Sequence, residues 1–210
     1  MRVKCQRSNV KGFPRGFSLV ELLVVVSIMT IITSVVLSGQ GAFNSQTLLT
    51  NLAYDMALGI REAQNYGLSV REVSPGSTNF NAGYGVHYDR SDLLAYVLFA
   101  DTDSGSGFNR LYDGTTVGCT NECVREYTIR RGNSIERFCA VASLDGSEHC
   151  SDSLTNPITF LDIVYPRAES DASIKTNRSV AYKSARIQII SPKGLRRTIE
   201  ATVTGQISPR

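Results

Sequence analysis

The pattern of hydrophobic and polar residues changes twice along this 210-residue chain. Between Leu19 and Leu37 nearly every residue is apolar, and Glu21 is the one charge. From Leu49 to Gly67 apolar residues recur every three or four positions, which predicts a helix with one apolar face. Later residues form short β-like runs separated by turn residues. We therefore expect an α+β fold, in which the second half of a long N-terminal helix packs on an antiparallel β-sheet head.

The pattern divides the chain into four expected segments. They are a basic leader at residues 1–16, a transmembrane helix at 17–41, an amphipathic helix at 42–70 and a β-rich head at 71–210. In the head we expect strands near residues 84–89, 94–99, 126–130, 135–141, 158–164, 180–191 and 195–204. The last two predict the clearest hairpin, because Pro192 and Gly194 suit a tight turn between them.

The first apolar run is long enough to cross a membrane. As a helix at about 1.5 Å per residue, it would span roughly 28 Å, close to the thickness of the hydrocarbon layer. The basic leader predicts that the N-terminus stays in the cytoplasm and that the chain after Leu37 is exported. A cleaved secretory signal and an ordinary single-span anchor are alternatives. Neither accounts for Glu21, because an acid inside a membrane span is costly and indicates a function.

Charge and composition narrow the class of protein. The formal net charge is +3, but the leader holds five of the 22 basic residues and none of the 19 acidic ones. Without the leader, 17 basic residues face 19 acidic ones, and the net charge becomes −2. This balance excludes a body that is basic throughout, as many nucleic-acid-binding proteins are, although it allows a local basic patch.

The residues that open the apolar run form a recognisable motif. Gly16-Phe17-Ser18-Leu19-Val20-Glu21 follows the basic leader and resembles the processing site of type IV prepilins and type II secretion pseudopilins. The resemblance implies that a prepilin peptidase cuts after Gly16 and methylates the new amino terminus at Phe17. It also implies that Glu21 faces the amino terminus of a neighbouring subunit in a filament. The implied partners are other pilin or pseudopilin subunits, the peptidase and an inner-membrane assembly platform, with the head outside the cytoplasm.

A second resemblance covers scattered positions. Residues 57–64, Gly83-Tyr84-Gly85-Val86 and residues 199–205 are similar to GspH-like pseudopilins and FimT-like minor pilins. This similarity implies a minor pilin or pseudopilin of a type IV pilus or a type II secretion filament. FimT-like proteins are associated with DNA uptake through a basic C-terminal Gly-Arg-x-Arg element. Only Arg210 stands at the matching place in this sequence, so DNA binding is the alternative function and not the leading one.

The cysteines predict disulfides. Cys5 lies in the leader, and the remaining four are Cys119, Cys123, Cys139 and Cys150. An exported segment favours oxidation, and four cysteines allow three pairings. Short turns favour Cys119 with Cys123 and Cys139 with Cys150. A metal site that includes His149 is the alternative, but the spacing matches no regular zinc motif, and we expect no metal.

Local charge offers a candidate anion site near the C-terminus. Seven basic residues and no acid lie between residues 172 and 199. Lys193, Arg196 and Arg197, together with Arg210, are the candidate contacts for DNA or another anion. The alternative is a solvated strand face that meets acidic neighbours.

Other candidate chemistry is weak. Residues 101–109 alternate oxygen-bearing side chains as calcium loops do, but a Gly/Ser/Asp hairpin loop explains the same residues. The chain has no Gly-x-Ser-x-Gly, no His-Glu-x-x-His and no phosphate loop. His87 lies in an alternating strand, which favours a structural role. We expect a protein with no catalytic residues and no cofactor.

Overall fold

The structure is a computed structural model that describes residues 16–69, 71–72, 82–102, 108–114, 119 and 121–210. The chain divides into two units, Met1–Gly41 and Ala42–Arg210. One helix, α1 (Leu19–Leu68), has residues in both units. The described strands are β1 (Gly83–Asp89), β2 (Asp92–Asp101), β3 (Cys123–Thr128), β4 (Ser134–Ala142), β5 (Glu148–Cys150), β6 (Phe160–Tyr165), β7 (Ser173–Thr176), β8 (Tyr182–Ile190), β9 (Arg196–Thr202) and β10 (Ile207–Pro209).

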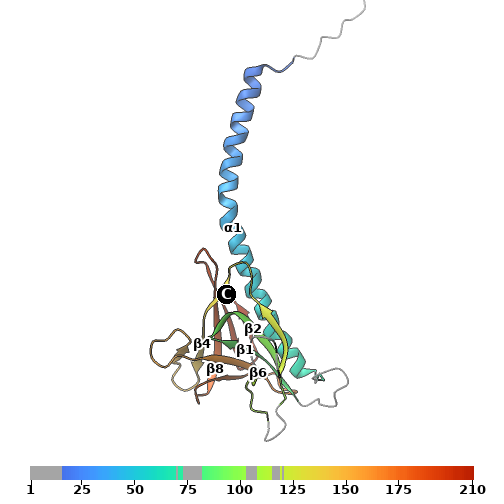
Figure 1. Ribbon diagram of the computed structural model, residues 1–210, viewed down its shortest axis with the longest axis vertical. Helices are drawn as coiled ribbons and strands as arrows, with labels where there is room; N and C mark the ends of the chain where they lie inside the picture. The colour runs from blue at the N-terminus through green and yellow to red at the C-terminus, as the bar shows by residue number, and fades with distance from the viewer. Residues whose placement is uncertain (1–15, 70, 73–81, 103–107, 115–118, 120) are drawn as a thin grey trace, which may run out of the picture. The chain divides into compact units, whose positions relative to one another are not determined.

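The strands form two antiparallel sheets, whereas the sequence pattern indicated one (Figure 1). The first sheet has the order β3-β2-β1-β6-β7, and the second has the order β10-β9-β8-β4-β5. The chain therefore changes sheet after β3, after β5 and after β7. Strand alternation shows which side chains face the core but not which strands pair, so the second sheet was not predicted.

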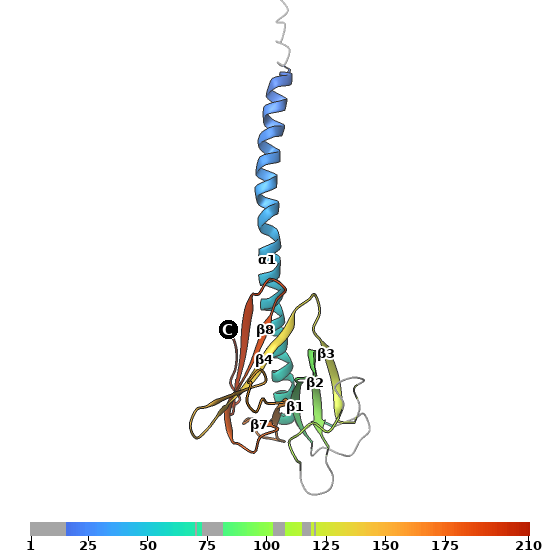
Figure 2. The same cartoon turned by 60° about the vertical axis from the view of Figure 1, so that its left-hand side comes forward.

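The amphipathic part of α1 lies in the core that both sheets share. Its buried side chains are those of the predicted apolar stripe, and in Figure 2 strands of the two sheets lie on either side of this part of the helix. The stripe consists of Leu49, Ala53, Met56, Ala57, Ile60 and Ala63. Each fully buried large apolar side chain contributes roughly 1.5–3 kcal/mol. The predicted α+β fold, with the helix packed on a sheet head, is confirmed.

Small residues allow the helix to approach the first sheet closely. A Cβ added at Gly67 would lie 2.8 Å from the backbone oxygen of Tyr165 in β6. A Cβ added at Gly59 would lie 3.2 Å from the hydroxyl oxygen of Tyr96 in β2. A larger side chain at Gly67 would therefore collide with the backbone of β6, and one at Gly59 would require the Tyr96 side chain to shift.

A polar cluster fixes the same helix to the edge strand β3. The hydroxyls of Tyr66 and Tyr127 donate to the two carboxylate oxygens of Glu62 at 2.5 and 2.6 Å. Arg125 lies 3.5 Å from the same carboxylate. Burial alone would raise the pKa of Glu62, but the hydrogen bonds from Tyr127 and Tyr66 and the charge of Arg125 hold it below its ordinary value. The cluster therefore stabilises the ionised form of Glu62.

The two disulfides are Cys119–Cys123 and Cys139–Cys150, which is the pairing that the turn lengths favour. Cys139 and Cys150 are directly opposite each other on β4 and β5. This second bond ties the very short edge strand β5 to its neighbour β4 in the second sheet.

Most expected strands occur near their predicted places. The expected strands at residues 84–89, 94–99, 135–141 and 158–164 correspond to β1, β2, β4 and β6, and the hairpin around Pro192 is formed by β8 and β9. The strand expected at 126–130 begins earlier, at Cys123, and ends at Thr128. β5, β7 and β10 were missed because three or four residues are too few to show alternation.

We expect Glu62→Gln to lower the free energy of unfolding by about 1–2 kcal/mol at neutral pH, because it removes the charge from two hydrogen bonds. A carboxylate with a lowered folded-state pKa stabilises the fold above its unfolded-state value, ordinarily 4.5, and this contribution disappears as the pH falls through the folded-state pKa. Denaturant unfolding of the full chain in detergent at pH 7 and pH 3 tests this. Glu126→Gln, on the same strand as Tyr127 and exposed, is the matched control. A deficit that is as large at pH 3 as at pH 7 would contradict the assignment.

The two disulfides allow a matched comparison. Removing Cys139–Cys150, with a sequence separation of 11, is expected to cost roughly 3 kcal/mol in the chain-entropy account. Removing Cys119–Cys123, with a separation of 4, is expected to cost roughly 2 kcal/mol. Unfolding of the two double-alanine variants, each compared with the oxidised parent, measures both values. An equal or reversed order would show that loop closure does not dominate.

Candidate processing and assembly site

The residues of the predicted processing motif lie at the start of α1. Gly16 and Phe17 precede the helix and are exposed, Phe17 with 81% of its surface accessible. The helix begins at Leu19, and the amide of Leu22 donates to the backbone oxygen of Ser18 at 3.1 Å. The Gly16–Phe17 peptide bond therefore lies in an exposed, non-helical stretch, as access by a peptidase requires.

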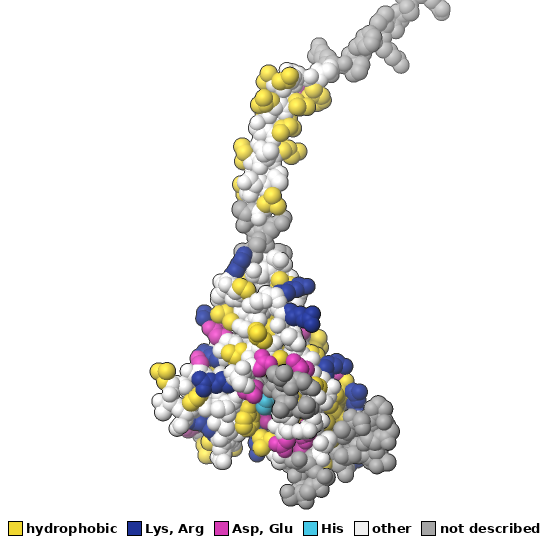
Figure 3. All heavy atoms as spheres, viewed as in Figure 1, with side chains coloured by type: hydrophobic (Ala, Val, Ile, Leu, Met, Phe, Trp, Pro, Cys, Tyr) yellow, Lys and Arg dark blue, Asp and Glu magenta, His cyan; other side chains and the backbone are white. Residues whose placement is uncertain are grey.

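The following segment exposes an unusual amount of apolar surface. Leu19–Leu37 is long and apolar enough to cross a membrane, and none of it is buried within the described chain. Figure 3 shows apolar side chains all along this segment. Water-soluble proteins rarely expose contiguous apolar surface of this extent, so the segment needs a bilayer or other apolar helices around it.

The hydroxyl groups in this segment are satisfied by its own backbone. Ser27 donates to the backbone oxygen of Leu23 at 2.8 Å, and Thr33 donates to that of Met29 at 2.6 Å. Thr30 does the same to Ser27 at 2.8 Å. These bonds make the hydroxyls compatible with a hydrocarbon environment, where an unpaired polar group is costly.

Unlike these hydroxyls, the carboxylate of Glu21 has no hydrogen-bond partner in its own segment. Glu21 lies in the first turn of α1, where the free backbone N–H groups of the helix N-terminus favour a negative charge. Within the described residues its carboxylate has neither a hydrogen bond nor an ion-pair partner. A carboxylate in an apolar surface thus has to find its partner in another molecule or in the interfacial water.

Two of the four candidate anion contacts are already paired with acids. Arg196 binds Glu136 through three hydrogen bonds of 2.6 to 2.9 Å, and these lower the pKa of Glu136. Arg210 lies 3.3 Å from Glu200, which also pairs with Arg186. Glu136 is far from Arg196 in the sequence and comes close only through the second sheet, so the sequence did not reveal this neutralisation.

Lys193 and Arg197 are the other two candidate contacts, and no ion pair involves either side chain within the described chain. The structure therefore does not bring the four residues together as one uncompensated basic patch. It leaves two of them available on the β8–β9 hairpin.

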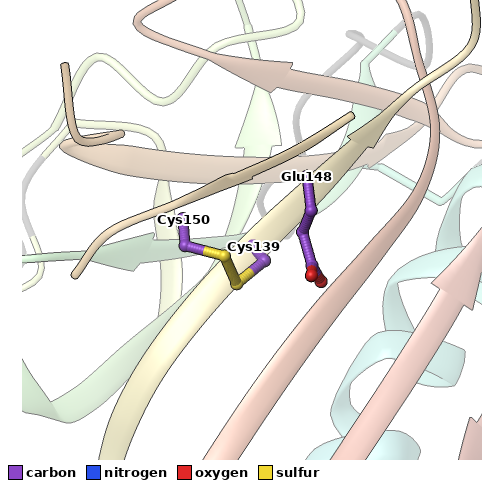
Figure 4. Close-up of side chains that lie close together, drawn as sticks. All are labelled: Cys139, Glu148 and Cys150. Carbon is purple, nitrogen blue, oxygen red and sulfur yellow. A yellow bond between two sulfur atoms is a disulfide. The ribbon is translucent and has the colours of Figure 1, made fainter. Parts of the chain in front are cut away.

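The candidate metal groups have structural roles instead. Cys139, Glu148 and Cys150 come close together, but the two sulfur atoms are bonded to each other and cannot act as thiolate ligands (Figure 4). The Nδ1 atom of His149 lies 3.2 Å from the hydroxyl of Tyr182. Residues 103–107 of the candidate calcium loop lie outside the described residues, so that hypothesis stays a prediction.

The sequence reasoning missed a buried histidine–aspartate pair. The Nδ1 atom of His87 in β1 lies 2.5 Å from a carboxylate oxygen of Asp162 in β6, and the other oxygen accepts the amide of Tyr112 at 3.2 Å. Burial raises the pKa of Asp162, although His87 and the Tyr112 amide oppose this shift. The signal in the sequence was an acid inside an apolar strand, residues 160–165.

Other buried acids hold the same loop region. The amide of Arg110 donates to Asp101 at 2.9 Å, and the amides of Thr102 and Asp113 donate to Glu122 at 2.7 and 3.1 Å. With Asp162, these carboxylates satisfy the backbone amides of four described residues after β2, which are Thr102, Arg110, Tyr112 and Asp113. We interpret the arrangement as a structural network, because its carboxylates accept hydrogen bonds from backbone amides.

Comparison with known proteins identifies one segment. Residues 14–37 match the prokaryotic N-terminal methylation motif. No curated protein and no solved structure matches the chain. The motif is typical of pilin-like structural subunits, which a peptidase processes and which assemble with other pilins. This chain therefore carries a type IV prepilin-like signal at residues 14–37.

Proposed function

We propose that this chain is a minor pilin or pseudopilin, a structural subunit of a type IV pilus or a type II secretion filament. It is cleaved after Gly16 and N-methylated at Phe17. The observation that carries the proposal is the exposed apolar helix Leu19–Leu37, which opens directly after an exposed cleavage site and contains one unpartnered acid.

Glu21 can set the axial register of the apolar helix within a filament. Cleavage would create a positively charged amino terminus at Phe17, and packing in a filament core would remove both charges from water. Breaking such a buried pair by removing one partner costs about 3–5 kcal/mol, whereas a purely apolar contact would tolerate sliding. The pairing of Glu21 with the amino terminus of a neighbouring subunit therefore favours one axial register.

The proposed location is the inner membrane before assembly, with one span and an extracytoplasmic head. The basic leader supports a cytoplasmic N-terminus. The two disulfides in the head support export, because such bonds persist in oxidising compartments. The partners are other pilin or pseudopilin subunits, the prepilin peptidase and an assembly platform in the membrane.

DNA uptake is less well supported. It would rest on Lys193, Arg196, Arg197 and Arg210, but Arg196 and Arg210 already pair with Glu136 and Glu200. The phosphate groups of DNA would have to compete with these two acids for the arginine side chains. We therefore keep the structural role as the proposal.

Processing predicts a defined mature N-terminus. When the full chain is expressed with a prepilin peptidase, mass spectrometry is expected to find N-methylphenylalanine from Phe17 at the start of the mature protein. Omission of the peptidase, which should leave the leader in place, is the control. A mature chain that starts near Ala42 would instead show an ordinary secretory signal.

Assembly is expected to depend on Glu21. The Glu21→Ala variant should still insert into the membrane, because the change makes the span more apolar. Its incorporation into filaments should fall roughly ten-fold or more, since a buried ammonium loses its partner. Thr30→Ala, which removes an intrahelical hydrogen bond from the same segment, is the matched control and should assemble normally. Quantitative blotting of sheared filaments against membrane fractions measures both, and wild-type incorporation of Glu21→Ala would refute the pairing.

A further inference from the structure

Two basic turns lie side by side at one end of the head unit. The β3–β4 turn carries Arg130 and Arg131, and the β8–β9 turn carries Lys193. A Cβ added at Gly132 in the first turn would lie 2.8 Å from the ring carbon Cγ of Pro192 in the second. Figures 1 and 2 both show the two turns at the same end of the sheets.

The first turns of α1 in the head unit lie at this same end. Leu48 and Asn51 on the helix line a hollow together with Arg130 and Arg131. Asp55 is the acid in that hollow, and it forms no ion pair with either arginine in the described structure. The β3–β4 turn therefore lies beside the first turns of α1 in the head unit, and the β8–β9 turn lies next to it.

Arg197 adds a fourth charge beside these turns. It follows the β8–β9 turn and lies on the same face of β9 as the buried Ile199, because side chains alternate along a strand. We call Arg130, Arg131, Lys193 and Arg197 the basic cap.

The charges of the basic cap are uncompensated. Among the residues that the structure describes, no acid pairs with the side chain of any of the four, and three of them are exposed. The neighbouring Arg196 differs, because Glu136 neutralises it. The cap thus presents positive charge on a mature chain whose overall charge is −2 by sequence.

Arg131 occupies an unfavourable backbone position. Its φ is 63°, and Gly132 follows with a φ of 73°. A tight turn of this kind prefers asparagine or glycine at the first position, and another residue there costs about 1–2 kcal/mol. The side chain of Arg131 is exposed and has no ion-pair partner among the described residues, so its charge is available to a ligand outside the head.

The chain connection places a bilayer within reach of the cap. Leu37 ends the apolar segment, and Leu48 follows eleven residues later. Even a fully extended connection of this length spans no more than roughly 40 Å, and a helical one spans roughly 17 Å. When Leu19–Leu37 crosses a membrane, this length limits the distance between the headgroup layer and Leu48, which lines the same hollow as Arg130 and Arg131.

We propose that the basic cap binds the headgroups of anionic phospholipids while the subunit is anchored in the membrane before assembly. This inference rests on the proposed function, because it needs the anchored subunit. Each basic residue near an anionic surface strengthens association roughly five-fold, and salt screens the attraction. The cap then holds the head against the bilayer until the subunit is withdrawn into a filament.

A tryptophan introduced by substitution can report on this contact without background tryptophan fluorescence, because the natural chain contains no tryptophan. Leu195→Trp places the donor in the β8–β9 turn at a partly exposed apolar position. The full chain is reconstituted in nanodiscs that contain a dansyl-labelled lipid, either in neutral phosphatidylcholine or with about one third phosphatidylglycerol. We expect energy transfer to be clearly higher in the anionic nanodiscs and to return to the neutral level in about 0.5 M salt, where the Debye length falls to roughly half its value at 0.1 M.

Two variants in the Leu195→Trp background separate the cap from general charge. The cap variant changes the three exposed residues of the basic cap, Arg130→Gln, Arg131→Gln and Lys193→Gln, and should abolish the anionic increase. The control changes Lys175, Arg178 and Lys183 to Gln, which removes the same charge from the region of β7 and the start of β8, and it should keep the increase. Equal transfer in both lipids, an unchanged increase in the cap variant, or equal losses in both variants would each overturn the proposal.

Two further measurements separate lipid binding by the cap from failed insertion and from nucleic-acid binding. Resistance to alkaline extraction shows whether the chain is inserted. Failure to insert refutes the proposed function and this inference with it, whereas insertion without the lipid-dependent transfer refutes the inference alone. Fluorescein-labelled duplex DNA is added to the neutral nanodiscs. If the Leu195→Trp protein binds DNA, the cap variant does not, and anionic lipid has no effect on energy transfer, then the partner of the cap is a nucleic acid and not a lipid.

Discussion

The head depends on the burial of one face of α1 between two sheets. Ala53, Ala57 and Ala63 are small enough to let the helix come close, and Met56 and Ile60 fill the remaining space without exposure. The two sheets share this core, so the inner face of each sheet needs the helix to shield its apolar side chains from water. Glu62 then ties the helix to β3 by accepting a hydrogen bond from Tyr127, and Tyr66 of the same helix donates to its other carboxylate oxygen. The head unit is therefore held together by one apolar stripe of α1 with a polar cluster at its edge.

Three carboxylates illustrate how the environment of an acid relates to its role. Glu62 is half-buried and receives two tyrosine hydroxyls, which lower its pKa. Asp162 is buried beside His87, and burial raises its pKa. Both serve the fold, because their partners lie in the same chain. Glu21 has an apolar surrounding and no partner within the described residues, which is the pattern of a group that acts between molecules.

The distribution of basic residues separates neutralised charge from available charge. Arg196 and Arg210 lie in or near a basic stretch of sequence, but Glu136 and Glu200 compensate them across the second sheet. The sequence did not indicate Arg130 and Arg131 as candidate anion contacts, because they lie outside that stretch. The fold brings them beside Lys193 at the entry of the helix. Local sequence charge was thus a poor guide to surface charge, since antiparallel pairing joins distant residues.

The sequence by itself determined the features that depend on local pattern. These are the prepilin-like signal, the apolar segment Leu19–Leu37, the buried stripe of the second half of α1, and most strands. Each follows from residue type and spacing, which act within one element. Only the tertiary structure decided that there are two sheets, that Asp162 meets His87 and that Arg196 is neutralised. These features join residues far apart in the chain, and alternation along a strand fixes its inward face but not its neighbour.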